Sequence, residues 1–159
     1  MSTPAVPYNA IACIRKDGVT GNAIDKYIDT LYAPSGATNF KQNDASIVLY
    51  VQSSTIGYTY VDTGILNLNS NMRTQVVSNY DGTNMAANLA NVSPISGAFG
   101  SGKFRGITRS SGTSANILAD GFGSSVAHTS GALSACNMYL FARNRFDDIL
   151  GKSSPQSIS

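Results

Sequence analysis

The chain has 159 residues, of which only 13% are charged, and its 11 Lys and Arg against 9 acidic residues leave a formal net charge of +2. Because these charges are spread thinly, with no run of like sign, binding to nucleic acid is not expected. No apolar stretch reaches the length of a membrane span, so membrane insertion is not expected either.

The composition favours an all-β fold. The chain contains no Glu and no Trp, while Ser, Asn, Thr and Gly, which are typical of turns and strands, are abundant. One domain of this length buries a sizeable core, and no repeat or linker divides the sequence. We predict an antiparallel β-sandwich over residues 10–150, preceded by an extended N-terminal arm at residues 1–9 and followed by a polar tail at residues 151–159. Pro4 and Pro7 disfavour a helix in the arm.

Short strands separated by turn residues follow one another along the chain, as in a sandwich or jelly roll. The predicted strands before residue 110 are residues 10–14, 27–30, 44–52, 57–64, 73–78 and 102–109. In the strongest of them, residues 44–52, one face would carry Ile47, Leu49 and Val51 and the other Val48 and Tyr50. Residues 83–94 are the one place where a helix competes, and Pro94 would keep it short.

The clearest hairpin is predicted at Asp120 and Gly121, between a strand at residues 116–119 and another at residues 122–128. An Asp-Gly pair supplies the positive φ angles that a type I′ turn requires. The sequence therefore predicts two antiparallel strands joined by a two-residue loop.

Residues 131–144 are predicted to contain a central strand of the sandwich. Between residues 136 and 143, one face would carry Cys136, Met138, Leu140 and Ala142, and the other Asn137, Tyr139, Phe141 and Arg143. Both sets are largely apolar, which indicates a strand covered on both faces. Arg143 and Asn144 would open a polar loop. A buried helix is the alternative, but Gly131 and the lack of a capping residue argue against it.

Four segments occur in an order that resembles one known family. They are Tyr-Ile-Asp-Thr at residues 27–30, Asn-Phe-Lys-Gln-Asn-Asp-Ala at residues 39–45, residues 102–109, and Leu-Phe-Ala-Arg-Asn at residues 140–144. The chain resembles the concanavalin A-like (LamG-like) jelly-roll domains of structural proteins in tailed bacteriophages, over about residues 24–144. The resemblance implies that residues 27–30 form an early edge strand and that the Asp-Gly hairpin forms paired outer strands.

The resemblance also implies a role in the virion, as a tail fibre, a tail-associated component or a head decoration. On this hypothesis the chain is not an enzyme, needs no cofactor, and assembles with itself and with other virion proteins. The N-terminus lacks the basic start and apolar run of a signal peptide, which favours assembly in the host cytoplasm. The family usually adds a strand after the Ala-Arg-Asn segment, so we expect an arm or strand from a neighbour, or the protein's own termini, to cover that edge in a homo-oligomer.

Two other functions on the same fold are weighed against this one, because the fold alone does not choose a function. A carbohydrate-binding adhesin would read host-surface glycans, and the residues proposed to do so are Tyr80, Asp81, Thr83 and Asn84, an aromatic ring beside hydrogen-bonding groups. A glycan-cleaving enzyme needs two carboxylates at a set separation, and nothing singles out two of the aspartates. It is the weakest of the three.

The remaining reactive residues are read as structural. His128, the one histidine, has no nucleophile pattern beside it, so we expect a hydrogen-bonded or solvated residue at a strand end. Oxygen donors at Asp62, Asn67, Asn69 and Asn71 lack the clustered carboxylates of a calcium site, so no metal is predicted. Cys13 and Cys136 have no metal-binding spacing, and two buried thiols are expected rather than a disulfide.

Overall fold

The computed structural model describes residues 14–15, 18–19, 28–51, 54, 56–57, 61–67, 70–98, 104–120, 122–140 and 143–145. Within these residues the regular secondary structure is almost entirely β-strand, with one short 3₁₀ helix, η1 (Pro34–Gly36). The strands are β1 (Ile14–Arg15), β2 (Gly18–Val19), β3 (Ile28–Asp29), β4 (Ala45–Tyr50), β5 (Thr63–Asn67), β6 (Met72–Val77), β7 (Asn84–Asn91), β8 (Ile95–Ala98), β9 (Phe104–Arg109), β10 (Ser114–Ala119), β11 (Phe122–Ala127), β12 (Tyr139–Leu140) and β13 (Arg143–Arg145). No helix in this part of the chain is long and apolar enough to cross a membrane.

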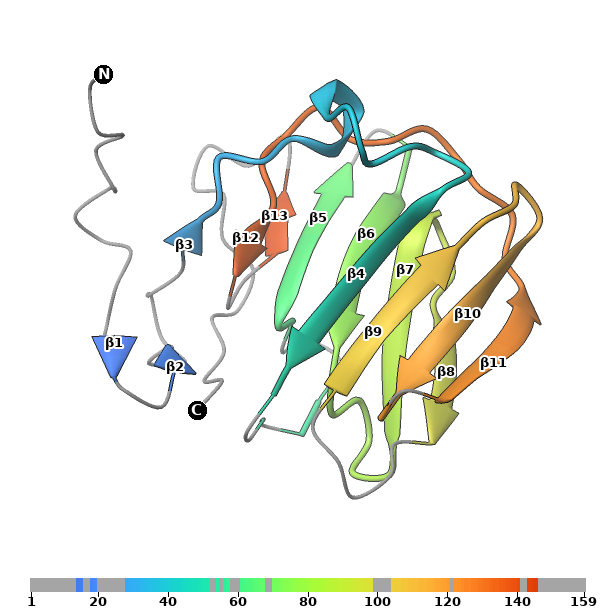
Figure 1. The fold of residues 1–159 in the computed structure, drawn as a ribbon. Helices are drawn as coiled ribbons and strands as arrows, with labels where there is room; N and C mark the ends of the chain where they lie inside the picture. The colour runs from blue at the N-terminus through green and yellow to red at the C-terminus, as the bar shows by residue number, and fades with distance from the viewer. Residues whose placement is uncertain are drawn as a thin grey trace.

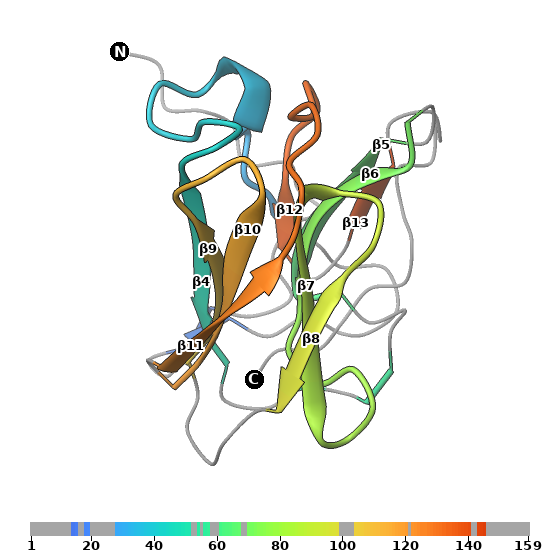
Figure 2. The ribbon, with the colours of Figure 1, turned by 90° about the vertical axis from the view of Figure 1, so that its right-hand side faces the viewer.

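Two antiparallel sheets face each other, as the β-sandwich prediction requires. The smaller sheet has the strand order β11-β10-β9-β4, and the larger has the order β3-β12-β5-β6-β7-β8, with β13 pairing in parallel with β5. Figures 1 and 2 show the two sheets as separate layers. A third, two-stranded sheet joins β1 and β2.

The main hydrophobic core lies between the two layers. Strands β4, β7 and β10 contribute alternate residues to it, since side chains on a strand point to opposite faces in turn. The buried members of this core are Phe40, Ala45, Ile47, Ile65, Val76, Met85, Ala87, Leu89, Ile95, Ile107, Ala115, Ile117 and Met138. The outer face of the larger sheet is also buried at β6 and β7, where Gln75, Val77, Ala86 and Asn88 lie. That sheet is therefore covered on both faces at these strands.

The strand predicted at residues 44–52 is confirmed as β4. Ala45 and Ile47 are buried, whereas Ser46, Val48 and Tyr50 are exposed, so the predicted division of faces also holds. Early in the chain, β3 lies at the edge of the larger sheet, within the predicted strand at residues 27–30. The strands predicted at residues 73–78 and 102–109 are confirmed as β6 and β9.

The Asp-Gly hairpin is confirmed as well. Strand β10 pairs with β11 in a register that sets Ala119 opposite Phe122 and leaves two residues for the loop. The first of these, Asp120, has a φ of 56°, the positive value that a type I′ turn needs at this position. Gly121 lies outside the described residues.

The central strand predicted within residues 131–144 is much shorter than expected. Residues 128–138 are not part of a strand, and among its described residues the run contains only the two-residue strand β12, between β3 and β5, and the first two residues of β13. The backbone of Met138 bonds with Thr30 and Tyr32, and the Cys136 N–H turns back to the Ser134 hydroxyl. The prediction that Arg143 and Asn144 open a polar loop is wrong, because both belong to β13.

Three other sequence expectations change. The helix that competed at residues 83–94 is strand β7, because Met85, Ala87 and Leu89 alternate into the core. Strand β8 was not expected, and the strand predicted at residues 57–64 is described only at its ends, with β5 beginning at Thr63. The arm at residues 1–9 and the tail at residues 151–159 lie outside the described residues.

Candidate functional site

The four residues predicted to bind glycans lie together where β6 turns into β7, three in the loop and Asn84 as the first residue of β7. The loop is closed by a backbone hydrogen bond of 2.7 Å from the Tyr80 N–H to the Asn84 carbonyl oxygen. Gly82 adopts a φ of +96°, which a glycine reaches without steric strain. The structure therefore places Tyr80, Asp81, Thr83 and Asn84 on one tight turn at the protein surface.

The Asp81 carboxylate is the centre of this turn. Its Oδ1 accepts hydrogen bonds from the Thr83 N–H, the Thr83 hydroxyl and the Asn84 N–H, at 2.9, 3.0 and 2.7 Å. Its Oδ2 accepts one from the Asn84 side-chain amide at 2.8 Å. These bonds, that from the Asn84 amide foremost, lower the pKa of Asp81 to about 2. The polar groups expected to read a glycan are thus engaged in holding the turn.

The Tyr80 side chain is half-buried against a small cluster on the outer face of the larger sheet. This cluster consists of Val61, Val77 and Ala86, all of them buried. Packing of this kind leaves less of the ring for a sugar to stack upon. Glycan binding by the Tyr80 loop stays a prediction.

Asp62 and Asn71, the two calcium candidates whose side chains the structure describes, do not converge. Asp62 comes just before the five-residue strand β5 and Asn71 follows it, so they are roughly 16 Å apart along the chain direction. The Asp62 carboxylate is fully buried and accepts a hydrogen bond from the Ser78 N–H. Asn69 lies outside the described residues, and no group of three or more His, Cys or Asp side chains within the described ones is placed to hold a metal.

His128 is a structural, hydrogen-bonded residue, as expected for a strand end. Its Nε2 accepts a hydrogen bond of 3.2 Å from the Leu89 N–H, and its carbonyl oxygen accepts one of 2.6 Å from the Arg109 guanidinium. Burial, with a smaller effect from the charge of Arg109, lowers the pKa of His128 to about 4. The imidazole is therefore neutral at pH 7 and acts as an acceptor for the β7 backbone. Cys136 is half-buried, and Cys13 lies outside the described residues.

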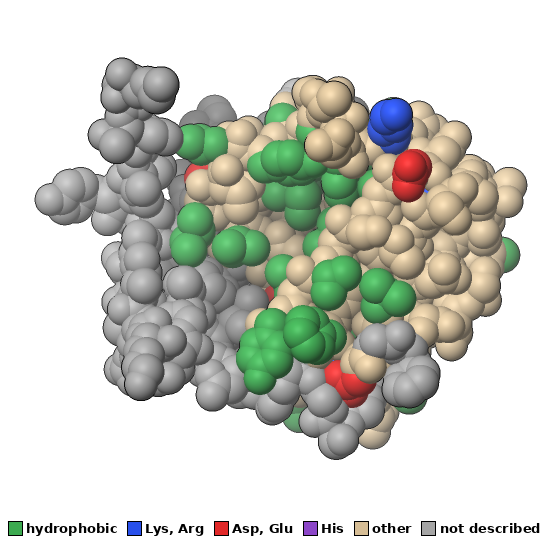
Figure 3. Space-filling model, in the orientation of Figure 1, with side chains coloured by type: hydrophobic (Ala, Val, Ile, Leu, Met, Phe, Trp, Pro, Cys, Tyr) green, Lys and Arg blue, Asp and Glu red, His purple; other side chains and the backbone are tan. Residues whose placement is uncertain are grey.

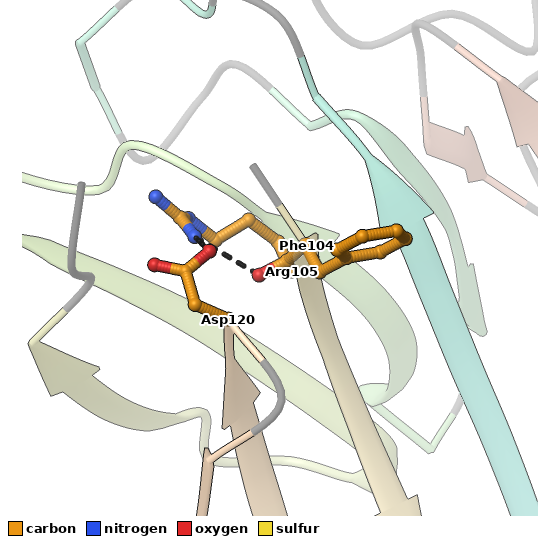
Figure 4. A network of polar contacts seen from close by, with 3 residues as sticks. All are labelled: Phe104, Arg105 and Asp120. Carbon is orange, nitrogen blue, oxygen red and sulfur yellow. Dashed lines mark hydrogen bonds and ion pairs between the residues drawn. The ribbon is translucent and has the colours of Figure 1, made fainter. Parts of the chain in front are cut away.

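An ion pair between the buried Arg105 and the partly exposed Asp120 ties the Asp-Gly hairpin to β9. The Arg105 guanidinium lies 2.9 Å from the Asp120 carboxylate and donates a second bond of 2.9 Å to the Phe104 carbonyl oxygen (Figure 4). In Figure 4 the Phe104 ring projects to the other side of β9, toward β4. Arg105 thus belongs to the interior and Phe104 to the outer face of the smaller sheet.

That outer face carries a set of exposed apolar side chains. Val48 and Tyr50 of β4 are 49% and 63% exposed, and Phe104 of β9 is 53% exposed. Tyr50 and Phe104 are directly opposite each other in the register of the two strands. Figure 3 shows hydrophobic side chains gathered at this part of the surface. We call Val48, Tyr50 and Phe104 the outer patch.

A hollow of about 310 Å³ opens beside β4, between the two sheets. On one side it is lined by Ile47 and Leu49 of β4, and on the other by Met138, Leu140 and Thr63. Figure 3 shows hydrophobic side chains at the bottom of this recess. The core is therefore open to the surface along one edge of the smaller sheet.

The comparisons with known proteins give no further guide. No protein-family model, no curated protein and no solved structure matches the chain.

The residues that sequence reasoning missed are those whose neighbours come from distant parts of the chain. Phe104 was predicted only as a strand residue, although the alternation in β4 already set Val48 and Tyr50 on one face. Pairing of β4 with β9 places Phe104 beside them, and no local pattern indicates that pairing. The hollow depends in the same way on Phe40 and Met138, which the fold brings to one place.

Proposed function

We propose that this chain is a non-enzymatic structural protein of a bacteriophage virion, a tail-fibre, tail-associated or head-decoration component that works through assembly contacts. The observation that carries the proposal is the smaller sheet, whose edge strand β4 is uncharged and whose outer patch exposes two aromatic rings. Exposed apolar surface beside a strand edge is typical of a protein interface. The resemblance of residues 24–144 to phage jelly-roll domains supports the same role.

The proposal includes the finer features of the fold. We propose that the sandwich is a concanavalin A-like jelly roll and that residues 1–9 form an extended arm. The assembly would take place in the host cytoplasm, and the finished protein would reside in the virion with copies of itself and with other virion proteins as partners.

Three ionisable groups in the described interior fit a structural protein. His128 accepts a bond from a backbone N–H, Arg105 holds a hairpin turn, and Asp62 accepts a bond from Ser78. Each therefore has a partner within a strand or a turn, and the proposal requires no chemistry from them.

The alternative, a carbohydrate-binding adhesin on the same fold, has less support. Its residues would be those of the Tyr80 loop, and the Asp81 carboxylate already accepts four hydrogen bonds within that loop. A glycan would have to compete with these bonds for the same oxygen atoms.

Labelling of purified phage particles tests the proposed function. Antibodies against the purified chain should decorate particles at fixed, repeated positions in electron micrographs. Quantitative mass spectrometry should find a constant number of copies in each particle. A chain that occurs in infected cells but not in purified particles would refute the proposal.

A further inference from the structure

We propose that the open edge of β4 and the hollow beside it form an acceptor site for one extended strand of a different virion protein. The proposal rests on the assembly role for the identity of that donor. The strand would add to the smaller sheet beyond β4, with its inward side chains in the hollow. Three features of the described residues lead to this inference.

The first feature is an overhang of the larger sheet. Strands β12 and β3 continue that sheet past the edge at which β4 ends the smaller one (Figure 1). The hollow lies at this step, since its lining comes from β4 on one side and from Met138 and Leu140 on the other. One additional strand beside β4 would lie over β12 and close the sandwich there.

The second feature is the direction of the β4 backbone groups. The Asp120 N–H donates to the Phe104 carbonyl oxygen at 2.9 Å, so the backbone groups of Phe104 face β10. Because such groups alternate along an antiparallel ladder, those of Arg105 face β4, where Leu49 is its partner. The Ile47 carbonyl oxygen likewise points at Gly106 of β9.

It follows that the odd-numbered residues of β4 bond with β9 and the even-numbered ones face away from it. The N–H and C=O groups of Ser46, Val48 and Tyr50 therefore point to the open edge. Within the described residues β4 has one neighbouring strand, β9. This row of alternating donors and acceptors is complementary to the backbone of another strand.

The third feature is the chemistry of the site. Strand β4 reads Ala-Ser-Ile-Val-Leu-Tyr, with no charge and no proline to discourage pairing. The hollow is lined mainly by apolar side chains, with Thr30, Tyr32, Ser46 and Thr63 as its hydroxyl-bearing residues. The strand that the partner protein supplies is therefore an uncharged segment of about six residues, apolar at the alternate positions that face inward.

Two other occupants fit the geometry less well. A small apolar molecule would fill the hollow but leave the outward N–H and C=O groups of β4 unpaired. A second copy joined through an antiparallel pair of β4 strands would be related by a two-fold axis perpendicular to the sheets. Since the larger sheet extends to both sides of that axis, the larger sheets of the two copies would collide.

Peptide selection on the purified chain tests the site. A random library of twelve-residue peptides is selected for binding, and one enriched sequence is synthesised as the probe. We expect enriched peptides with apolar residues at alternate positions and no charge among the central six. In amide hydrogen exchange, the probe should slow the N–H groups of Ser46, Val48 and Tyr50 and leave those of Ile47 and Leu49, already bonded in the ladder, unchanged.

Two variants complete the test. Val48→Pro removes an N–H that points to the open edge without removing a bond to β9, and should weaken the probe at least about tenfold. Val92→Lys is the matched control, since Val92 is 42% exposed in the loop between β7 and β8, and it should bind the probe unchanged. Thermal unfolding establishes that the Val48→Pro variant is folded. The hydrogen-exchange measurement uses the native chain and does not depend on any variant.

Four results would overturn the proposal. The first is a selection that enriches no alternating sequences, the second is a probe that binds without slowing exchange of the Val48 N–H, and the third is a Val48→Pro variant that binds the probe as well as the native chain does. The fourth result is protection of the Val48 N–H that rises with protein concentration when no peptide is present. The last result would assign the edge to a second copy. All these measurements use the purified chain. Absence of the chain from particles would refute the proposed function instead, so the two failures are distinguishable.

Discussion

Tyr50 and Phe104 meet edge to face on the outer side of the smaller sheet, with ring centroids 5.2 Å apart and an interplanar angle of 72°. The two residues are a cross-strand pair of β4 and β9, and both rings remain more than half exposed. A pair of rings in this geometry stabilises the sheet, and it also leaves a firm apolar surface at the strand edge.

The two rings should be energetically coupled. In a double-mutant cycle with Tyr50→Ala and Phe104→Ala, we expect a coupling free energy of about 0.5–1.5 kcal/mol in urea unfolding. Val92→Ala combined with Phe104→Ala is the control, because the loop of Val92 belongs to the other sheet, and this cycle should be additive. Additivity of the Tyr50 and Phe104 changes would contradict the observed ring contact.

The ion pair between Arg105 and Asp120 should stabilise the hairpin. Asp120→Asn keeps a residue that tolerates positive φ but removes the charge beside a buried guanidinium, so we expect a loss of about 1–3 kcal/mol of unfolding free energy. Asp44→Asn, at an exposed position before β4, is the control and should change stability by less than about 0.5 kcal/mol. Equal stabilities for the two variants in denaturant unfolding would contradict the role of the pair.

Gly106 is predicted to be intolerant of any side chain. A Cβ at this position would overlap the Ile47 carbonyl oxygen of the neighbouring strand and lie 3.0 Å from the Val48 Cα. Gly106→Ala must therefore push β4 and β9 apart, at a cost of about 1–3 kcal/mol. Gly36→Ala is the control, since nothing lies within 4 Å of a Cβ there. Thermal unfolding of both variants decides the matter, and a Gly106→Ala variant as stable as the control would contradict the close approach.

Two buried groups should give opposite pH dependences of stability. Burial lowers the pKa of His128 from 6.5 to about 4. The contribution of the neutral imidazole to the unfolding free energy is therefore present above pH 6.5 and is lost as the pH falls through about 4. Burial raises the pKa of Asp62 from 3.8 to about 6, against opposing effects of Ser78 and Arg105. The contribution of the protonated Asp62 carboxyl to the unfolding free energy is full below pH 3.8 and is lost as the pH rises through about 6. Each effect is on the order of 3 kcal/mol.

Because the two effects oppose each other, the unfolding free energy of the native chain should vary little between pH 4 and 6. His128→Gln keeps an acceptor for the Leu89 N–H but does not titrate, so the stability of this variant should fall as the pH rises from 4 to 6. Asp62→Asn should show the reverse trend, with stability falling as the pH decreases from 6.5 to 4. Urea unfolding across this range measures both trends, and parallel curves for the two variants would refute the assignment.

Any glycan binding should depend on the Tyr80 ring and not on a metal. On a glycan array, Tyr80→Ala should abolish binding, while a chelator should leave the native signal unchanged. Tyr32→Ala, at an exposed tyrosine that lines the hollow beside β4, is the control. Binding that survives Tyr80→Ala, or that disappears with the chelator, would contradict the prediction.

Sequence reasoning succeeded where the structure is decided by neighbouring residues. The alternation in residues 44–52 predicts which side chains of β4 are buried, because a strand has a period of two whatever its partner. The Asp120 and Gly121 hairpin was predictable for the same reason, since positive φ is a property of the two residues themselves. The Tyr80 loop was found because its members are consecutive in the sequence.

Prediction from the sequence failed where distant segments compete for the same backbone groups. Residues 131–144 are apolar enough for a long strand, but the Met138 carbonyl oxygen accepts bonds from Thr30, over a hundred residues away in the sequence. Strand β13 then pairs in parallel with β5, a pairing that local patterns do not indicate. The outer patch and the hollow were missed for this reason, because both form only when β4 takes its place beside β9 and across from β12.

Amide hydrogen exchange on the assembled particle tests the central claim, that the chain works through assembly contacts at β4, most directly. We predict that the N–H groups of Ser46, Val48 and Tyr50 exchange freely in the purified chain and become protected in the virion. Those of Ile47 and Leu49 should be protected in both. Equal exchange of the Val48 N–H in the free chain and in the particle would contradict the account.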